Sequence, residues 1–195
     1  MTNPNQDSPQ TSAQPATDGS RRRRFLGAGL SAAPVVLTMV SQPALGGTCF
    51  SPSQALSKNT SLSRPRPQCL GAQSPGNYKA QTTNWPSSVK PTDKFHDTFA
   101  KGSNANFRRK TFQEVLDLTQ GEDKSKTAFH VIGAHLNILG GSGAVIPPEV
   151  LTVATLKEVW RQYAVNGFYL PIPGGSIKWY GDDIVQYLKT NDIVA

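Results

Sequence analysis

Residues 125–141 read SKTAFHVIGAHLNILGG and carry a clear helical pattern. Four apolar side chains follow one another at spacings of three and four residues, which places them on one face of a helix. They are Phe129, Ile132, Leu136 and Leu139. The pair Gly140–Gly141 ends the pattern, as glycines do after a helix C-terminus. This stretch therefore predicts a helix from Ser125 to Leu139 with one apolar face.

Three other segments also predict helices. Thr111 to Glu114 reads Thr-Phe-Gln-Glu, a capping box that begins one. The second runs from about Thr152 to Asn166, and the last from about Trp179 to Thr190. Residues 168–173, between the last two, are extended at most. We therefore expect a mainly α fold, a small bundle of about four short helices with long Pro/Gly-rich loops and a disordered N-terminal region.

The chain has 195 residues, of which 37% are hydrophobic, enough for one ordinary domain and additional segments. Its composition divides it into four parts. We expect a disordered polar segment at residues 1–20, a signal core and cleavage region at 21–46, an irregular arm with an aromatic loop at 47–92, and a helical domain at 93–195. Frequent proline and the lack of helical periodicity are the basis for the irregular arm.

Four consecutive arginines, Arg21–Arg24, precede sixteen residues without charge. That uncharged run is too short and too rich in small residues for a transmembrane helix, which needs about 20 apolar residues. Ala44 and Gly46 provide small side chains for cleavage after Gly46. A basic segment, a short apolar segment and a small-residue cleavage site are typical of a secretory signal.

The stretch Arg22-Arg23-Arg24-Phe25-Leu26 resembles the twin-arginine export pattern, which is two arginines, any residue, Phe and Leu. The resemblance implies that Arg22, Arg23, Phe25 and Leu26 are recognised by the export machinery. A signal peptidase would then release a periplasmic or extracellular protein. The alternative is a basic tail for nucleic acid or a nuclear address. Residues 47–195 carry 16 basic and 11 acidic side chains, so no nucleic-acid partner is expected.

Cys49 and Cys69 are the only cysteines of the chain. In an exported protein an even pair predicts a disulfide, and the alternative is two unpaired thiols. The bridge would close a loop of about 20 residues, which stabilises the fold by roughly 3 kcal/mol in the chain-entropy model.

Residues 71–86, GAQSPGNYKAQTTNWP, form a distinctive loop with a turn at Pro75–Gly76. The loop resembles a family of uncharacterised exported bacterial proteins, whose signature is Ser-Pro-Gly-aromatic-Trp-Lys-Asn-His-Pro followed by Trp-Pro. The matching residues are Ser74, Pro75, Gly76, Lys79, Trp85 and Pro86, whereas Gln81 replaces the family's histidine. The resemblance covers most of residues 69–190 and implies kinship but no activity. Tyr78, Lys79 and Trp85 are candidates for binding a ligand, and the alternative is that Tyr78 and Trp85 anchor the loop by packing.

His96, His130 and His135 are the only histidines and weak candidates for a metal site. His130 and His135 are five residues apart, not the four of a helical zinc pair, so ordinary surface or core histidines are favoured. Arg108-Arg109-Lys110 lies between Phe107 and Phe112. It could form a basic and aromatic patch that binds single-stranded nucleic acid or an acidic glycan, and the alternative is a solvated turn.

No catalytic residues are assigned and no cofactor is expected. The sequence thus favours an exported, noncatalytic binding or structural protein. The alternative is a small exported enzyme or a protein that binds a cofactor or a metal.

Overall fold

The computed structural model describes residues 47–57 and 66–195 of the chain. The expected disordered segment and the signal, including Arg22, Arg23, Phe25 and Leu26, lie outside the described residues. The described part is mainly helical, as the sequence predicts. Its helices are α1 (Pro52–Ser57), α2 (Pro75–Ala80), α3 (Phe95–Thr98), α4 (Phe112–Leu116), α5 (Thr127–Ile138), α6 (Val153–Asn166) and α7 (Gly181–Thr190). Strands β1 (Gly47–Thr48) and β2 (Gln68–Cys69) pair antiparallel, with Gly47 opposite Cys69.

The four helices expected from the sequence are α4, α5, α6 and α7. Local capping explains where two of them begin. The Thr111 hydroxyl accepts a hydrogen bond from the Glu114 amide at 3.2 Å, and the Glu114 carboxylate accepts one from the Thr111 amide at 2.6 Å. These two bonds form the predicted capping box at the start of α4. The Thr152 hydroxyl caps α6 by accepting from the Thr155 amide at 3.0 Å.

Helix α5 begins at Thr127, two residues later than the sequence indicates, because of its cap. The Asp123 carboxylate accepts hydrogen bonds from the amides of Ala128 and Phe129, at 3.1 and 2.9 Å. To bring Asp123 there, Ser125 and Lys126 adopt left-handed backbone angles, with φ of 59° and 56°. These angles lie outside the right-handed helix, so the regular helix starts only after them.

Two helices form where the sequence predicts irregular structure, α1 and α2. Each has six residues, too few to show a helical period in the sequence. In α2, the Ser74 hydroxyl caps the Asn77 amide at 3.2 Å and Pro75 occupies the first turn, a position that suits proline. Residues 168–180 form a hairpin-like loop in which Tyr169 and Trp179 exchange two backbone hydrogen bonds of 2.8 Å.

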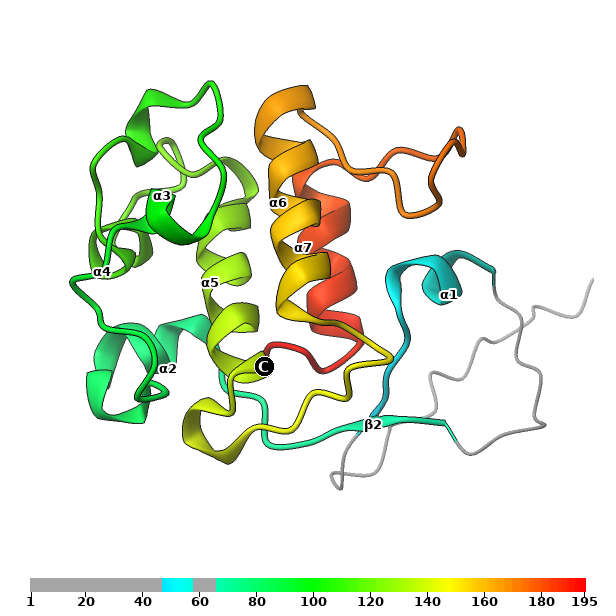
Figure 1. Ribbon diagram of the computed structural model, residues 1–195, viewed down its shortest axis with the longest axis horizontal. Coiled ribbons are helices and arrows are strands. Elements are labelled where there is room, and N and C mark those ends of the chain that lie inside the picture. The colour runs from blue at the N-terminus through cyan, green and yellow to red at the C-terminus, as the bar shows by residue number, and fades with distance from the viewer. Residues whose placement is uncertain (1–46, 58–65) are drawn as a thin grey trace, which may run out of the picture. The chain divides into compact units, whose positions relative to one another are not determined.

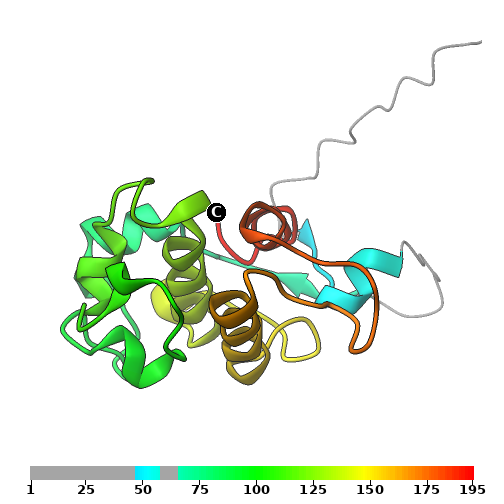
Figure 2. The same cartoon turned by 90° about the horizontal axis from the view of Figure 1, so that it is seen from above.

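Helix α5 is the centre of the bundle. Figures 1 and 2 show it between α6 and α7 on one side and the short helices α2, α3 and α4 on the other. Ten of its twelve residues are buried. Gly133 lets α2 approach closely, since a Cβ atom there would lie 2.6 Å from the Pro75 side chain. The 47–92 segment and the helical part therefore share one core, to which Cys49, Cys69, Tyr78 and Trp85 contribute.

An aromatic cluster fills the space between α3, α4 and α6. The ring centroid of Phe95 lies 5.0 Å from that of Phe99 and 5.1 Å from that of Trp160. Phe107 and Phe112 complete the cluster. Offset and edge-to-face contacts of this kind stabilise a core beyond the area that they bury.

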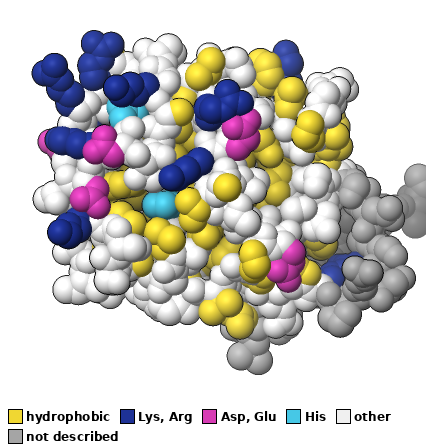
Figure 3. All heavy atoms as spheres, viewed as in Figure 1, with side chains coloured by type: hydrophobic (Ala, Val, Ile, Leu, Met, Phe, Trp, Pro, Cys, Tyr) yellow, Lys and Arg dark blue, Asp and Glu magenta, His cyan; other side chains and the backbone are white. Residues whose placement is uncertain are grey.

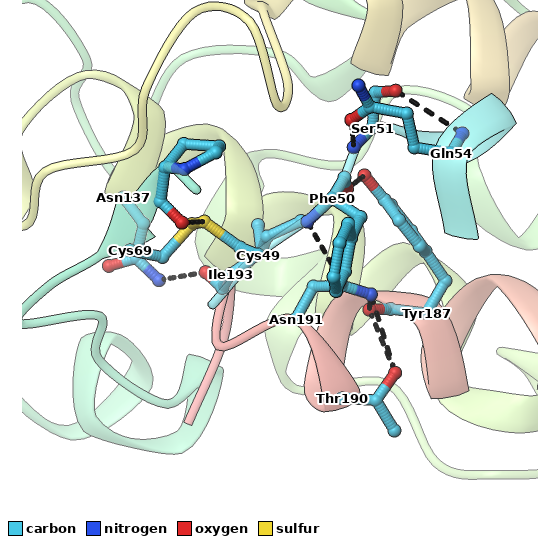
Figure 4. Close-up of a disulfide and its surroundings, with 11 residues drawn as sticks. Cys49, Phe50, Ser51, Gln54, Cys69, Asn137, Tyr187, Thr190, Asn191 and Ile193 are labelled. Carbon is cyan, nitrogen blue, oxygen red and sulfur yellow. Dashed lines mark hydrogen bonds between the residues drawn. A yellow bond between two sulfur atoms is a disulfide. The ribbon is translucent and has the colours of Figure 1, made fainter. Parts of the chain in front are cut away.

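Cys49 and Cys69 form the predicted disulfide, with their Cα atoms 5.9 Å apart. The bridge holds an arm that is also bound to α7. The Phe50 amide donates to the Asn191 side chain at 2.9 Å, and the Tyr187 hydroxyl donates to the Phe50 carbonyl at 2.9 Å (Figure 4). Among the residues that the structure describes, none belongs to a helix long and apolar enough to cross a membrane.

Replacing both cysteines, as Cys49→Ser/Cys69→Ser, should lower the free energy of unfolding by about 3 kcal/mol, because the unfolded chain regains the freedom that the closed loop removes. Urea unfolding of both proteins measures this difference. Reductant should destabilise the wild type by a similar amount and leave the variant unchanged. Equal unfolding midpoints for wild type and variant would contradict a stabilising role for the bridge.

Candidate functional site

Tyr78 and Trp85, the ring-bearing candidates of the 71–86 loop, both point into the core. Tyr78 is fully buried, and burial raises its pKa to about 12, so its hydroxyl stays protonated and can donate to Asn137 Oδ1 at 2.6 Å or to the Gly141 carbonyl at 2.9 Å. Trp85 Nε1 donates to the Tyr78 carbonyl at 2.9 Å. These are the contacts of packing anchors. The third candidate, Lys79, is exposed and forms a salt bridge of 3.0 Å with Asp117.

Asn137 joins three segments of the chain, a role that the sequence does not indicate. Its side-chain oxygen accepts from the Gln73 amide at 3.0 Å. Its side-chain nitrogen donates to the carbonyls of Gln73 and Ile193, at 2.9 and 2.8 Å. The side chain is fully buried, so its polar atoms have no contact with water. These hydrogen bonds provide the partners that buried polar groups need, because an unpaired buried donor or acceptor is destabilising. Asn137 therefore fixes the start of the aromatic loop and the C-terminal segment to α5.

The three histidines lie apart and each has its own packing. His130 Nδ1 lies 2.8 Å from the Lys126 carbonyl, and His96 Nδ1 lies 3.3 Å from the Phe99 carbonyl. His135 is buried with its ring stacked on Phe112, at 6.0 Å between centroids. Burial lowers the pKa of His130 and lowers that of His135 to about 4, with the charge of Lys157 adding to the effect on His135. Across residues 47–57 and 66–195, no group of three or more His, Cys, Asp or Glu side chains could hold a metal ion.

A basic hollow of about 610 Å³ opens beside α3. We define it by the four cationic side chains that line it, Lys94, Lys101, Arg108 and Arg109, with His96, Asp97, Gly102 and Asn104 completing the wall. Figure 3 shows Lys and Arg side chains gathered around a histidine on this part of the surface. The volume is in the range of sites for small ligands.

Backbone pairing brings together the cations of residues 94–109, which would lie far apart if this stretch were extended. The segment at Lys94 pairs antiparallel with that at Thr111. The Phe95 amide donates to the Lys110 carbonyl and the Phe112 amide to the Asp93 carbonyl, both at 3.0 Å. A 3₁₀ turn, η2 (Ala105–Phe107), then turns the chain back toward α3. The pairing therefore places Arg108 and Arg109 beside α3.

The cations of the hollow outnumber the carboxylates on its wall. No salt bridge involves any of its four cations among the residues described, and Asp97 is the single carboxylate on its wall. Lys94 Nζ donates to the Arg109 carbonyl at 2.8 Å, and its charge helps to lower the pKa of Glu114, a carboxylate that does not line the hollow. Unpaired cations held together in a concave surface attract anions and raise their local concentration.

The phenylalanines beside the basic stretch do not add an exposed ring to the hollow. The two rings that flank the basic stretch in sequence, Phe107 and Phe112, are both buried in the aromatic cluster. Neither of these two rings offers a face on which a base could stack, and stacking supplies much of the affinity for single strands. Among the described residues, His96 is the ring on the wall. Arg108 and Arg109 instead present guanidinium groups, whose planar geometry matches carboxylate and phosphate groups.

The pKa of His135 leads to a pH dependence of stability. In the unfolded chain a histidine takes up its proton near pH 6.5, whereas His135 in the fold does so only near pH 4. As the pH falls through this window the unfolded state binds the proton first, so stability falls with pH, by up to about 3 kcal/mol at its lower end. The variant His135→Phe keeps the ring contact with Phe112 but cannot take up a proton. Its free energy of unfolding should therefore fall less than that of the wild type when the pH is lowered from 7 to 4.5.

Urea unfolding of both proteins at pH 7 and at pH 4.5 measures this. The contribution of His130 is present in both proteins and cancels in the comparison. Parallel pH profiles for the wild type and His135→Phe would contradict the role of His135.

Comparison of the chain with protein-family models, with curated proteins and with solved structures finds no match. The resemblance of the 71–86 loop to an exported bacterial family therefore stays a prediction. The functional conclusion depends on the geometry of the chain itself, in which the basic hollow is the surface feature with the most clearly defined chemistry.

Proposed function

We propose that this chain is an exported, noncatalytic protein that binds an anionic ligand in the basic hollow. The observation that carries the proposal is a set of four cations on the wall of a 610 Å³ hollow, Lys94, Lys101, Arg108 and Arg109. None of them forms a salt bridge within residues 47–57 and 66–195. Desolvated or partly enclosed cations form strong charge-assisted hydrogen bonds with carboxylate and phosphate oxygens.

Export is supported by two independent features. The stretch Arg22 to Leu26 has the spacing of a twin-arginine signal, with Gly46 at a suitable cleavage point. The Cys49–Cys69 disulfide is compatible with an oxidising compartment such as the periplasm or the cell exterior. The partners of the signal would be the twin-arginine machinery and a signal peptidase.

A binding role is favoured over catalysis by the side chains that line the hollow. Among the described residues of its wall, none is a Ser, Thr or Cys that could act as a nucleophile. His96 Nδ1 faces the Phe99 carbonyl, which orients the ring by a backbone contact and not by a carboxylate. The alternative, a small exported enzyme or a protein with a cofactor or metal, would have to rely on His96, Asp97 or the lysines of the wall as its reactive groups.

The binding proposal is tested with the full-length chain and two anions, inorganic phosphate and trigalacturonate. Backbone amide signals of residues 94–110, followed by NMR, should shift and saturate. Lys101→Ala/Arg108→Ala removes two cations whose side chains make no hydrogen bond in the described structure and should weaken binding about tenfold or more, as expected for the loss of charge-assisted contacts.

The matched control is Lys90→Ala/Lys189→Ala, which removes the same charge outside the hollow and should leave the affinity within about twofold. Residues 21–24 are identical in all three proteins, so a difference between them reports on the hollow. Equal weakening by both double variants, or no binding of either anion by the wild type, would overturn the proposal.

Export is tested by Arg22→Lys/Arg23→Lys, which keeps the charge but removes the arginine pair. In a bacterium with the twin-arginine route, the wild type should appear in the periplasm, shortened and oxidised at Cys49 and Cys69. The variant should stay in the cytoplasm at full length. Arg21→Lys/Arg24→Lys, which keeps the pair, is the control and should be exported. Fractionation and mass spectrometry measure all three; periplasmic Arg22→Lys/Arg23→Lys would contradict a twin-arginine signal.

A further inference from the structure

A second hollow, of about 450 Å³, adjoins the basic hollow and has different chemistry. Its wall comes from four places in the chain: the loop at 102–107, the turn at 123–125, the C-terminal half of α6 and the start of α7. Gly102 and Asn104 line both hollows. The two hollows are therefore neighbours across one short segment.

That segment is held tightly against α6. Trp160 Nε1 donates to the Ala100 carbonyl at 2.9 Å, and the Ser103 amide donates to the Ala164 carbonyl at 3.4 Å. Gly102 comes so close to α6 that a Cβ atom would lie 2.6 Å from the Ala164 carbonyl oxygen. The segment is thus a fixed wall, and a ligand that reaches over it meets both hollows in a defined geometry.

The second hollow offers exposed aromatic surface and several polar groups. Tyr180 is 56% exposed and Tyr163 is half-buried, whereas Phe107 and Trp160 are 5% and 1% exposed and take part in the aromatic cluster. The polar side chains on the wall include Ser103, Ser125 and Asp182. Hydroxyl and carboxylate groups can hydrogen-bond to sugar hydroxyls while an exposed ring packs on the apolar face of the sugar.

Backbone strain marks both hollows. Arg109 in the basic hollow and Ser125 in the second hollow have left-handed backbone angles, with φ of 62° and 59°. Such angles are unfavourable for residues other than glycine and persist where the surrounding structure enforces them, often at binding sites. Here the cap formed by Asp123 on α5 enforces the angle at Ser125.

We propose that the two hollows form one site for an acidic saccharide, whose carboxylate or phosphate group lies in the basic hollow and whose sugar ring lies in the second. This inference rests on the proposed anion-binding function and names its ligand class. Joining the two groups in one molecule makes the second contact intramolecular, so the whole ligand binds more tightly than either part.

The test measures the affinity of the full-length chain, by calorimetry or NMR, for five probes: trigalacturonate, glucose 1-phosphate, inorganic phosphate, maltotriose and AMP. At least one of the two acidic saccharides should bind tenfold or more tightly than inorganic phosphate and than the neutral maltotriose. The stronger of the two identifies the anionic group as carboxylate or phosphate.

Tyr180→Ala should weaken binding of that acidic saccharide fivefold or more and leave the affinity for inorganic phosphate within twofold. Ile177→Ala, at an exposed residue outside the hollow, is the matched control and should change neither affinity. Circular dichroism and thermal melting of both variants check that the fold is kept.

Three outcomes would overturn the inference. In the first, the acidic saccharides bind no better than inorganic phosphate, while phosphate binding is still weakened by Lys101→Ala/Arg108→Ala. This result would show that the second hollow takes no part in binding, and it would leave the anion site in place. Tighter binding of AMP than of both acidic saccharides would assign the second hollow to a base. If no anion binds, the proposed anion-binding function itself is contradicted.

Discussion

The burial of α5 is the constraint on which the rest of the fold depends. A helix with ten of twelve residues buried needs partners on every side, and α2, α4, α6 and α7 supply them. A small chain can place so many partners around one helix only if short segments are fixed to it individually. Gly133 does this for Pro75 by close approach, and Asn137 does it for Gln73 and Ile193 by hydrogen bonds. The buried side-chain amide of Asn137 thereby fixes the positions of the segments at Gln73 and Ile193, which are too short to fold alone.

The aromatic cluster beside α5 has a consequence for the surface. Phe95, Phe107 and Phe112 are buried in the cluster, whereas the adjacent cations at 94, 108 and 109 are exposed and line the hollow together. Packing in the core and charge on the surface are thus two results of the same arrangement. Four cations share this wall with one carboxylate, Asp97, and an anionic ligand would stabilise such an excess of positive charge.

Much of the helical architecture could be predicted from local patterns. The capping box at Thr111 and Glu114 and the apolar spacing of Phe129 and Ile132 depend on residues within one or two turns, and the helices they predict are present. The six-residue helices α1 and α2 could not be predicted in this way, because they are shorter than the window in which a period becomes visible. The start of α5 was shifted by the Asp123 cap, which needs two left-handed residues that no propensity favours.

For the site too, some features could be predicted from neighbouring residues, whereas others depend on contacts between separate segments. The sequence alone determined the approximate positions of the main helices. It predicted a disulfide between Cys49 and Cys69, with two free thiols as the alternative, and it contains a stretch that resembles a twin-arginine signal. Only the tertiary structure decided that Tyr78 and Trp85 lie in the core, and that Lys94 and Lys101 meet Arg108 and Arg109 in one hollow. The physical reason is that helix signals arise from neighbours in sequence, whereas burial and charge clustering arise from contacts between distant segments, here the pairing of Lys94 with Thr111 and the packing of Gly102 on α6.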